Sequence, residues 1–458
     1  MAGLLAARVL TDHFAKVTLI ERDRFPDSVE NRRGVPQGPH AHGLLAEGKK
    51  IMSRLFPDLA ATLIEGGSVM VDLGAEMRWH HFGGYKVQFQ SGLVGLSQSR
   101  PFLEWHVRRR VLALENLECL LECDARELVA SSDHTHITGV KIQRRSTRGD
   151  ERLDAHLVVD AMGRGSPSPK WIEWLGYPKP EETVIKIGVG YASRIYRRRP
   201  GDLQGDKLLI AFPTPPRETR MGALFPIEGD RWLLTLGGWV GDHPPADEEG
   251  FLEFARSLPA PDIYDFITRA EPLTGIVPYK FPSNLRRRYE DMVRLPEGYI
   301  VLGDALCSLN PIYAQGMTVS ALEAAMLDQC LREQWRRRGD LIGFPRRFFR
   351  RVAKVVDTVV ISLKQGTNYT ASATVTVLDQ GGSPVSGAQV DGSWTLNSLD
   401  IGTGSGITGS DGVSTIDSSK EKPSGGDTFR FTVTNVILDG YTYESASNVE
   451  NSDFVDVP

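Results

Sequence analysis

The stretch GYIVLGDALCSLNPIYAQGM, residues 298–317, decides the fold of this chain. It opens with a short apolar run that ends in Gly303 and Asp304, which predicts a buried parallel strand running into a loop. Residues 310–317 form a second loop with proline and glycine, and the pattern after them predicts a long amphipathic helix over 318–335. An acid after a glycine at a strand end can bind sugar hydroxyls, and a helix N-terminus stabilises negative charge. The alternative interpretation is an ordinary strand-to-helix turn.

A comparable acid stands near the start of the chain. Residues 2–10 are small and apolar and predict a helix, and residues 16–23 predict a β-branched strand that ends in acids. Glu21 lies 18 residues after Gly3, which is the spacing at which a dinucleotide-binding unit places the acid that binds ribose. The preceding strand and the first two glycines of that unit are missing, so we expect the chain to begin at about the last glycine.

A third strand end repeats the pattern. Residues 158–166, VVDAMGRGS, place Asp160 and flexible backbone after an apolar strand. Each segment alone is compatible with an ordinary turn. Their order and spacing in one chain are much less compatible with chance, and they favour the dinucleotide-binding interpretation.

With these motifs, residues 2–350 resemble the FAD-dependent monooxygenases of the para-hydroxybenzoate hydroxylase and squalene-epoxidase-like class. Asp160 stands at the second motif of that class, and residues 303–317 match its third motif, the most specific signal in the chain. The resemblance implies an α/β, Rossmann-like FAD-binding domain interleaved with an antiparallel-sheet substrate domain. It also implies FAD as the cofactor and NAD(P)H as the co-substrate.

The resemblance further implies which residues bind FAD. Residues 35–45 look like the loop that runs from the FAD ribose towards the flavin, and residues 99–108 look like the helix whose arginines contact FAD. The cofactor-binding residues implied are Gly3, Glu21, Arg33, Arg100, Arg108, Asp160, Gly303, Asp304, Pro311, Gly316 and Met317. No side chain can be named as an essential acid or base, because in this class the cofactor performs the chemistry.

The chain departs from the class at several positions. Ala161 and Ala314 stand where the class usually has glycine, and Cys307 stands where many relatives have histidine. A small buried thiol is the preferred interpretation of Cys307. His40 and His42 form an HxH pair, but no third ligand cluster accompanies them, so no metal site is predicted. The absent first strand would leave an unpaired, apolar gap in the sheet and remove backbone donors for the FAD pyrophosphate.

The composition changes abruptly near residue 362. The chain of 458 residues is 41% hydrophobic and 24% charged, which are ordinary globular values, and its net charge of -5 gives no reason to expect nucleic acid as a partner. Residues 362–458 hold 12 acids against 4 bases and contain no Cys, His or Met, whereas the residues before them have a net charge of +3. Two different compositions therefore share one chain.

The tail predicts short strands separated by Gly, Ser and Asp turns. Residues 373–379, 388–395, 412–417 and 428–435 carry the alternation, and residues 371–447 resemble the immunoglobulin-like β-sandwich modules appended to secreted bacterial hydrolases. That context is extracellular. The front of the chain has four cysteines without a CxxC pair and no signal peptide, which favours the cytoplasm. The two parts thus indicate different compartments. This favours an aberrant or fused gene model that joins two unrelated parts, and a natural fusion is the alternative.

The expected organisation has three domains and a linker. The FAD-binding domain, truncated at its N-terminus, comprises 1–75, 96–180 and 296–360, the substrate domain comprises 76–95 and 181–295, the linker is 361–370, and the immunoglobulin-like β-sandwich is 371–458.

The resemblance implies an FAD-dependent monooxygenase that hydroxylates or epoxidises an apolar or aromatic small molecule with NAD(P)H and O2. The missing phosphate-binding strand argues against activity of this chain. Two alternatives stay open: a flavin-dependent reductase or dehydrogenase on the same fold, and an inactive fused remnant carrying an adhesive or spacer sandwich. A halogenase is disfavoured because the WxWxIP signature is absent. The expected partners are the substrate and O2, with no nucleic acid and no integral membrane segment.

Overall fold

The computed structural model describes residues 1–215, 217–357, 371–379, 382–419, 421, 428–440, 443 and 452–456. The chain divides into two compact units, Met1–Ala353 and Lys354–Pro458, which are called unit 1 and unit 2 below. The predicted linker 361–370 lies outside the described residues. None of the helices that the structure describes combines the length and the apolar character that a bilayer span requires.

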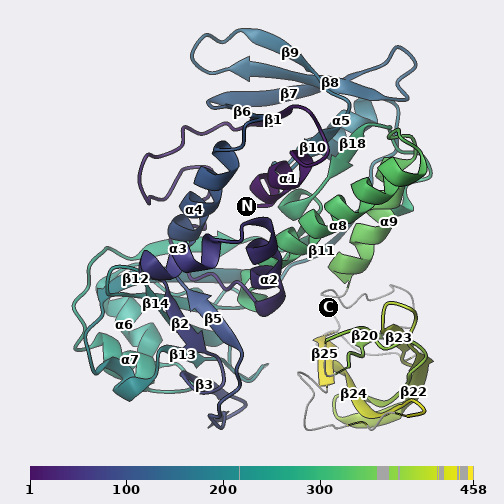
Figure 1. Cartoon of the computed structure of the whole chain (residues 1–458). Coiled ribbons are helices and arrows are strands. Elements are labelled where there is room, and N and C mark those ends of the chain that lie inside the picture. The colour runs from purple at the N-terminus through teal and green to yellow at the C-terminus, as the bar shows by residue number, and fades with distance from the viewer. Residues whose placement is uncertain are drawn as a thin grey trace. The chain divides into compact units, whose positions relative to one another are not determined.

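Unit 1 contains two separate pairs of parallel strands (Figure 1). β1 (Val17–Ile20) pairs with β6 (Leu117–Leu120), and β10 (Val158–Asp160) pairs with β18 (Tyr299–Val301). All three residues of β18 are buried, as its continuous apolar run predicts for a parallel strand covered on both faces. β1 ends directly before Glu21, and β10 ends in Asp160. Both acids of the sequence motifs therefore lie at the carboxyl ends of strands.

Three helices pack beside these strands. α1 (Ala2–Leu10) packs against α8 (Gly316–Arg337) and α4 (Arg100–Leu112). The start of α4 is fixed by Ser99, whose hydroxyl accepts a hydrogen bond from the Phe102 amide at 3.2 Å. The predicted helices over 2–10 and 318–335 are confirmed, and α8 extends two residues further at each end.

A three-stranded antiparallel sheet lies beside the parallel pairs (Figure 1). It is formed by β7 (Cys123–Ala130), β8 (Ile137–Arg144) and β9 (Asp150–Asp154). Its apolar core includes Val140 and Ile142, and Ile20 of β1 packs against it. This sheet therefore covers one face of the first parallel pair.

A seven-stranded sheet forms the second layer of unit 1. Its strands, in spatial order, are β16 (Val277–Phe281), β12 (Val189–Arg197), β15 (Arg231–Gly238), β14 (Arg220–Ile227), β13 (Leu208–Ala211), β3 (Met77–His81) and β4 (Gly84–Tyr85). Alternate residues such as Ala192 and Leu234 share a core with α6 (Glu248–Arg256) and α7 (Asp262–Ile267). Tyr191 and Met221 belong to a separate aromatic and apolar cluster on this sheet.

The remaining elements of unit 1 connect these layers. They are α2 (Ala46–Leu55), α3 (Leu59–Glu65), β2 (Val69–Asp72), β5 (Val94–Ser97), α5 (Ser168–Trp174), β11 (Glu181–Ile185), η1 (Asp202–Gly205), β17 (Asn284–Arg288), η2 (Tyr289–Asp291), η3 (Gly303–Ala305), β19 (Cys307–Ser308) and η4 (Pro311–Tyr313). α9 (Phe344–Asp357) follows α8. Unit 1 is therefore a mixed α/β structure with several sheets.

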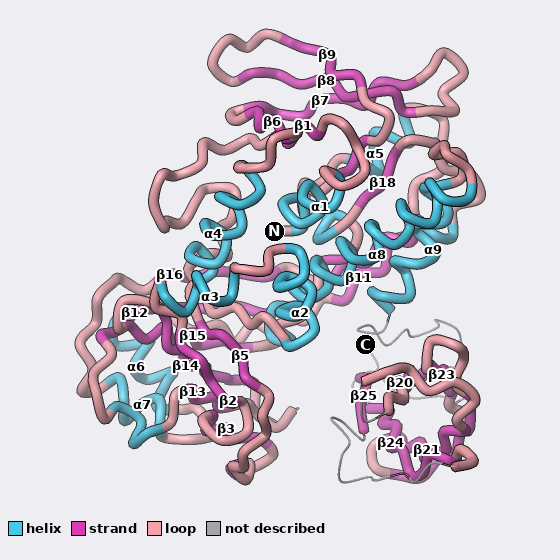
Figure 2. The backbone as a smooth tube through the Cα atoms, in the orientation of Figure 1, coloured by secondary structure: helices cyan, strands magenta, loops and turns pink. Residues whose placement is uncertain are grey.

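The described residues from 371 onward contain strands and loops only (Figure 2). β20 (Ser372–Thr376) pairs with β23 (Val413–Asp417), and the second sheet has the order β22 (Leu399–Ile407), β21 (Gln389–Leu396), β24 (Thr428–Ile437), β25 (Ser452–Asp456). Ile416 of the first sheet shares one core with Trp394 and Phe431 of the second. The four predicted alternating segments coincide with strands, apart from the end of the first, whereas the immunoglobulin-like identity stays a prediction.

Candidate functional site

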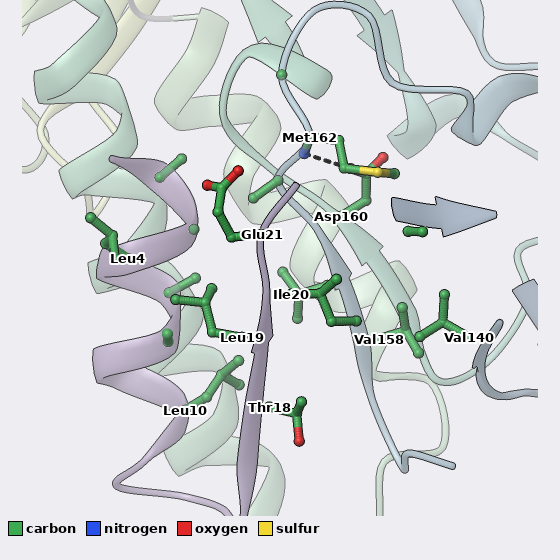
Figure 3. A pocket seen from close by; sticks show the side chains of 18 of the residues that line it. Leu4, Leu10, Thr18, Leu19, Ile20, Glu21, Val140, Val158, Asp160 and Met162 are labelled. Atoms are coloured by element: carbon green, nitrogen blue, oxygen red, sulfur yellow. Dashed lines mark hydrogen bonds between the residues drawn. The ribbon is translucent and has the colours of Figure 1, made fainter. Parts of the chain in front are cut away.

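A cavity of about 2090 Å³ runs through the first layer of unit 1. α1, β1 and β10 line one part of it, and the loop over residues 32–43 with the segment over 304–317 lines another. Figure 3 shows the first part, in which Leu4 and Leu10 belong to α1, Leu19 belongs to β1 and Glu21 directly follows that strand. The cavity therefore has an apolar part and a charged part.

The apolar part is a slot between two strand edges. Within the described residues, β1 pairs only with β6 and β10 only with β18, so each strand has one edge without a ladder partner. Leu10 of α1 and Val140 of β8 line the slot together with Ile20 and Val158 (Figure 3). Unpaired backbone groups in an apolar space are unfavourable. The slot thus has apolar side chains on both faces, from α1 and from β8, which is the lining that a buried strand needs.

The charged part is organised around Glu104, which is buried on α4. Its carboxylate accepts a hydrogen bond from Arg32 Nε at 2.7 Å and pairs with Arg100 Nη2 at 3.1 Å. Arg32 also bridges to Glu21 at 3.1 Å and to Asp23 at 3.0 Å. Burial alone would raise the pKa of Glu104. The flanking guanidinium groups outweigh this effect and lower the pKa to about 2.

One arginine nitrogen in this network has no partner. Arg100 Nη1 is buried and makes no hydrogen bond among the described residues, although Arg100 lines the cavity. A buried cationic donor without an acceptor is costly. Nη1 itself has no accessible surface, so it reaches an acceptor group in the cavity only if the Arg100 side chain shifts.

Asp304 of η3 provides a carboxylate to the same cavity. Gly303 adopts a left-handed φ of +65°, and its amide donates to Glu323 Oε2 on α8 at 2.6 Å, which fixes the turn. Asp304 lines the cavity, and no hydrogen bond or ion pair to its carboxylate is present among the described residues. Asp304 is exposed to the cavity, but its enclosure within the unit raises the pKa of its carboxyl, and the Met1 ammonium, Arg100 and Arg164 act in the opposite direction. Its oxygens are available to hydroxyl donors.

Asp160 is used differently. It is 3% exposed, and its Oδ1 accepts the Met162 amide at 2.8 Å (Figure 3). The Ser166 and Ser168 hydroxyls donate to its Oδ2. Asp160 therefore holds the turn after β10 in shape, although it also borders the cavity.

The structure brings eight of the eleven predicted residues to the cavity wall: Gly3, Glu21, Arg100, Asp160, Asp304, Pro311, Gly316 and Met317. Arg33 is exposed and does not line the cavity, whereas its neighbour Arg32 does. Arg108 is buried, donates to the Pro26 carbonyl oxygen at 2.9 Å and lies over the Phe25 ring. Gly303 lies behind Asp304. Their roles in cofactor binding stay predictions.

His40 fastens the loop over residues 32–43 to the seven-stranded sheet. Its Nδ1 lies 2.8 Å from the Ser193 hydroxyl, which in turn contacts the Thr235 hydroxyl at 2.6 Å. Burial lowers the pKa of His40 to about 4, so the ring is neutral near pH 7. Within the described residues, no group of three or more His, Cys, Asp or Glu side chains is placed to hold a metal ion.

Ala314, the residue that departs from the class at the end of η4, has a left-handed φ of +52°. This conformation costs an L-residue about 1 kcal/mol relative to glycine. We therefore expect Ala314→Gly to raise the free energy of unfolding by up to about 1 kcal/mol, measured by denaturant unfolding. The matched control is Ala113→Gly at the end of α4, where φ is -86° and the change should destabilise. A loss of stability at position 314 would contradict the strain argument.

Comparison with known proteins agrees with this geometry. No protein-family profile matches the chain. PqsL of Pseudomonas aeruginosa, described as "a probable FAD-dependent monooxygenase", superposes with a TM-score of 0.56 at 16% identity, covering 78% of this chain and 91% of that one. A flavoprotein/dehydrogenase of Cytophaga hutchinsonii gives 0.55 at 14% identity, covering 78% and 82%. The flavin-dependent brominase Bmp2 gives 0.56 at 13% identity, covering 76% and 80%. Unit 1 therefore has the fold shared by these flavoproteins.

A sequence relative is closer. Protein Rv3254 of Mycobacterium tuberculosis is 33% identical to the chain over 347 residues, which are 72% of this chain and 71% of the relative. Identity of this extent over most of both chains reflects common descent. The chain belongs to the family of Protein Rv3254.

Proposed function

We propose that unit 1 is an FAD-dependent monooxygenase that hydroxylates or epoxidises an apolar or aromatic small molecule with NAD(P)H and O2. The observation that carries the proposal is the convergence on one cavity of the Asp304 carboxylate, to which no hydrogen bond is present among the described residues, and the first turns of α1 and α8, which have no side-chain caps. The fold shared with PqsL and Bmp2 supports it.

The residues around the cavity fit the parts of FAD. Asp304 and Glu21 would accept hydrogen bonds from ribityl and ribose hydroxyls, and Arg100 would donate to an anionic or carbonyl oxygen. The first turns of α1 and α8 both border the cavity, and neither has a side-chain cap, so their amides suit phosphate oxygens or a charged ring edge. These donors and acceptors complement the hydroxyl, phosphate and carbonyl groups of a dinucleotide.

FAD, when bound, would supply the transfer of electrons from NAD(P)H to O2 and of an oxygen atom to the substrate. The chain itself would hold and orient the reactants. Pro311, Gly316 and Met317 would lie against the flavin ring, and Tyr279 and Phe281 of β16 line the cavity where a substrate would meet it. The apolar and aromatic cluster that includes Tyr191, Phe281 and Met221 supports an apolar or aromatic substrate.

We extend the proposal to the domain organisation. The FAD-binding domain would comprise 1–75, 96–180 and 296–360, and the substrate domain 76–95 and 181–295. β3 supports the inclusion of 76–95 in the substrate domain, because it pairs with β13 of the seven-stranded sheet. The tail, 371–458, would be an immunoglobulin-like sandwich without a role in catalysis, supported by its two sheets and shared core.

A purified full chain incubated with excess FAD and freed of unbound cofactor tests the proposal. We expect the visible absorbance of bound flavin, and NAD(P)H oxidation with O2 uptake coupled to product hydroxylation. A flavin bound without oxygen transfer would favour the reductase or dehydrogenase, which the Cytophaga hutchinsonii neighbour supports. No bound flavin would overturn the proposal and favour the inactive remnant.

Asp304→Asn is expected to weaken FAD binding by about 10- to 100-fold. The reason is the loss of a charge-assisted hydrogen bond, worth about 1.5–3 kcal/mol. Fluorescence titration of the full chain with FAD measures the change. Asp328→Asn is the matched control, because Asp328 lies on α8 and pairs with His13 and Arg332 away from the Asp304 turn. Equal affinities of wild type and Asp304→Asn would contradict the assigned role.

A further inference from the structure

The backbone around His42 is fastened at both ends. The Ala41 amide donates to the Thr235 hydroxyl of β15 at 2.9 Å, and the Leu45 amide donates to the Thr318 hydroxyl of α8 at 3.2 Å. Between these anchors, Gly43 lies so close to Ala314 that a Cβ on it would come within 2.7 Å of the alanine methyl. His42 lines the cavity from this rigid segment.

The position of the proton on the His42 ring follows from one contact. Nδ1 lies 2.8 Å from the His40 carbonyl oxygen. A carbonyl oxygen only accepts, so Nδ1 carries the hydrogen and donates it. In the neutral ring the lone pair is then on Nε2. No hydrogen bond to Nε2 is present among the described residues.

The charges around His42 keep the ring neutral. Burial lowers the pKa of His42 to about 4, and the Arg100 guanidinium acts in the same direction. The hydrogen bond to the His40 carbonyl and the Glu104 carboxylate favour the protonated ring but do not outweigh these effects. The His40 ring contributes a small lowering.

We propose that His42 is a neutral hydrogen-bond acceptor of this cavity, beside the carboxylates of Glu21 and Asp304, and that its Nε2 binds an N–H or O–H donor of the ligand. The identity of that ligand, though not the acceptor itself, rests on the proposed function. The donor is either an N–H group of the flavin ring or a hydroxyl of the substrate. The Arg100 guanidinium, which also lines the cavity, adds a positive charge to the same wall.

Chemical modification tests the state of the ring without cofactor or activity. Diethyl pyrocarbonate acylates only unprotonated imidazole nitrogens, and an ordinary histidine with a pKa near 6.5 is mostly protonated at about pH 5.5. We expect His42 of the full chain to be modified at this pH, as mapped by peptide mass spectrometry. His40 should be spared, because its Nε2 is fully buried. A modification midpoint near pH 6.5 for His42, or no modification, would overturn the proposal.

Protection experiments identify the source of the donor. If the flavin supplies it, FAD protects His42, and His42→Leu weakens FAD binding about 5- to 10-fold while His42→Gln, which keeps an acceptor, restores most of it. If the substrate supplies it, phenol protects His42 in the chain with or without FAD, whereas toluene, of the same shape without the hydroxyl, does not. His81→Leu is the matched control, because burial also lowers the pKa of His81 but this residue does not line the cavity.

The outcomes separate the two proposals. A chain that binds no FAD but whose His42 is protected by phenol refutes the proposed function and supports the acceptor. A chain that binds FAD with equal affinity in wild type and His42→Leu, and in which neither FAD nor phenol protects His42, refutes the acceptor and leaves the proposed function standing.

Discussion

Replacing Glu323 with glutamine is expected to stabilise unit 1 strongly at neutral and alkaline pH. Glu323 is fully buried on α8, and its Oε1 has no hydrogen-bond partner among the described residues. Burial and the nearby Asp304 carboxylate raise the pKa of Glu323, the Gly303 amide and Arg286 lower it, and the net result is a pKa of about 8. Glutamine keeps the oxygen that accepts the Gly303 amide but has no charge to bury.

The sign of the effect follows from proton linkage. Between pH 4.5 and about pH 8 the folded chain holds the Glu323 proton and the unfolded chain has lost it. Stability therefore falls as pH rises through this range, by up to about 1.4 kcal/mol per pH unit, and the full loss is present above pH 8. Below pH 4.5 the carboxyl is neutral in both states and wild type and Glu323→Gln should be equally stable. The advantage of the variant should reach the order of 5 kcal/mol at pH 8.

Urea unfolding of both proteins between pH 4 and pH 9 measures this difference. Glu333→Gln is the matched control on the same helix, because the salt bridge to Arg351 at 2.8 Å lowers the pKa of Glu333. Its substitution should remove a small stabilisation that is present above pH 4.5. Glu333→Gln should therefore lower the free energy of unfolding, whereas Glu323→Gln should raise it. A pH-independent difference between wild type and Glu323→Gln would show that the buried carboxyl does not titrate as argued.

The local pattern of the sequence predicted much of what surrounds this residue. The apolar run before Gly303 and the helical spacing after Gly316 are local signals, and β18 and α8 lie where these signals place them. Glu323 was not predicted, although a signal existed: it lies four residues from both Val319 and Leu327, so helical periodicity places an acid on the buried face. An acid on that face is a candidate for a buried, functional carboxyl.

Other parts of the site depend on contacts that a sequence does not display. Arg32 and Arg33 are adjacent in an irregular loop, where no period assigns a direction to either side chain. Arg32 turns inward because Glu104, 72 residues further along the chain, accepts its Nε hydrogen. The internal use of the Asp160 carboxylate depends likewise on the path of the turn through Ser166 and Ser168. Motif matching therefore located the cavity wall but not which groups remain available on it.

An apolar strand attached to the N-terminus through a short glycine-containing turn is expected to fill the slot between β1 and β10 and to stabilise unit 1. A strand parallel to β10 would end beside α1, because Gly3 lies close to Ala161, which directly follows β10. A short turn could therefore join it to Met1. The resulting strand–helix–strand unit would connect to β1 in the usual right-handed sense.

The size of the effect can be estimated for five residues. Each apolar side chain buried in the slot contributes about 1.5–3 kcal/mol, and ordering each residue costs about 1–2 kcal/mol, so these contributions nearly cancel. The hydrogen bonds to the two free edges remain, at about 1 kcal/mol each. A net gain on the order of 5 kcal/mol follows, provided that both β1 and β10 accept the strand.

The decisive comparison uses a control extension of the same length and apolarity with proline at its two central positions. Proline removes the amide donors and cannot pair with both edges, so this control keeps the hydrophobic burial and loses the ladder. Denaturant unfolding should show a gain only for the first extension, and hydrogen exchange should slow at amides of β1 and β10. Equal stabilities of the two extended chains would show that the slot accepts apolar mass without specific pairing. FAD affinity should be measured on both extended chains. In each of them the turn before Met1 would add backbone donors beside the first turn of α1. A difference in affinity would therefore report whether FAD binding depends on the strand pairing.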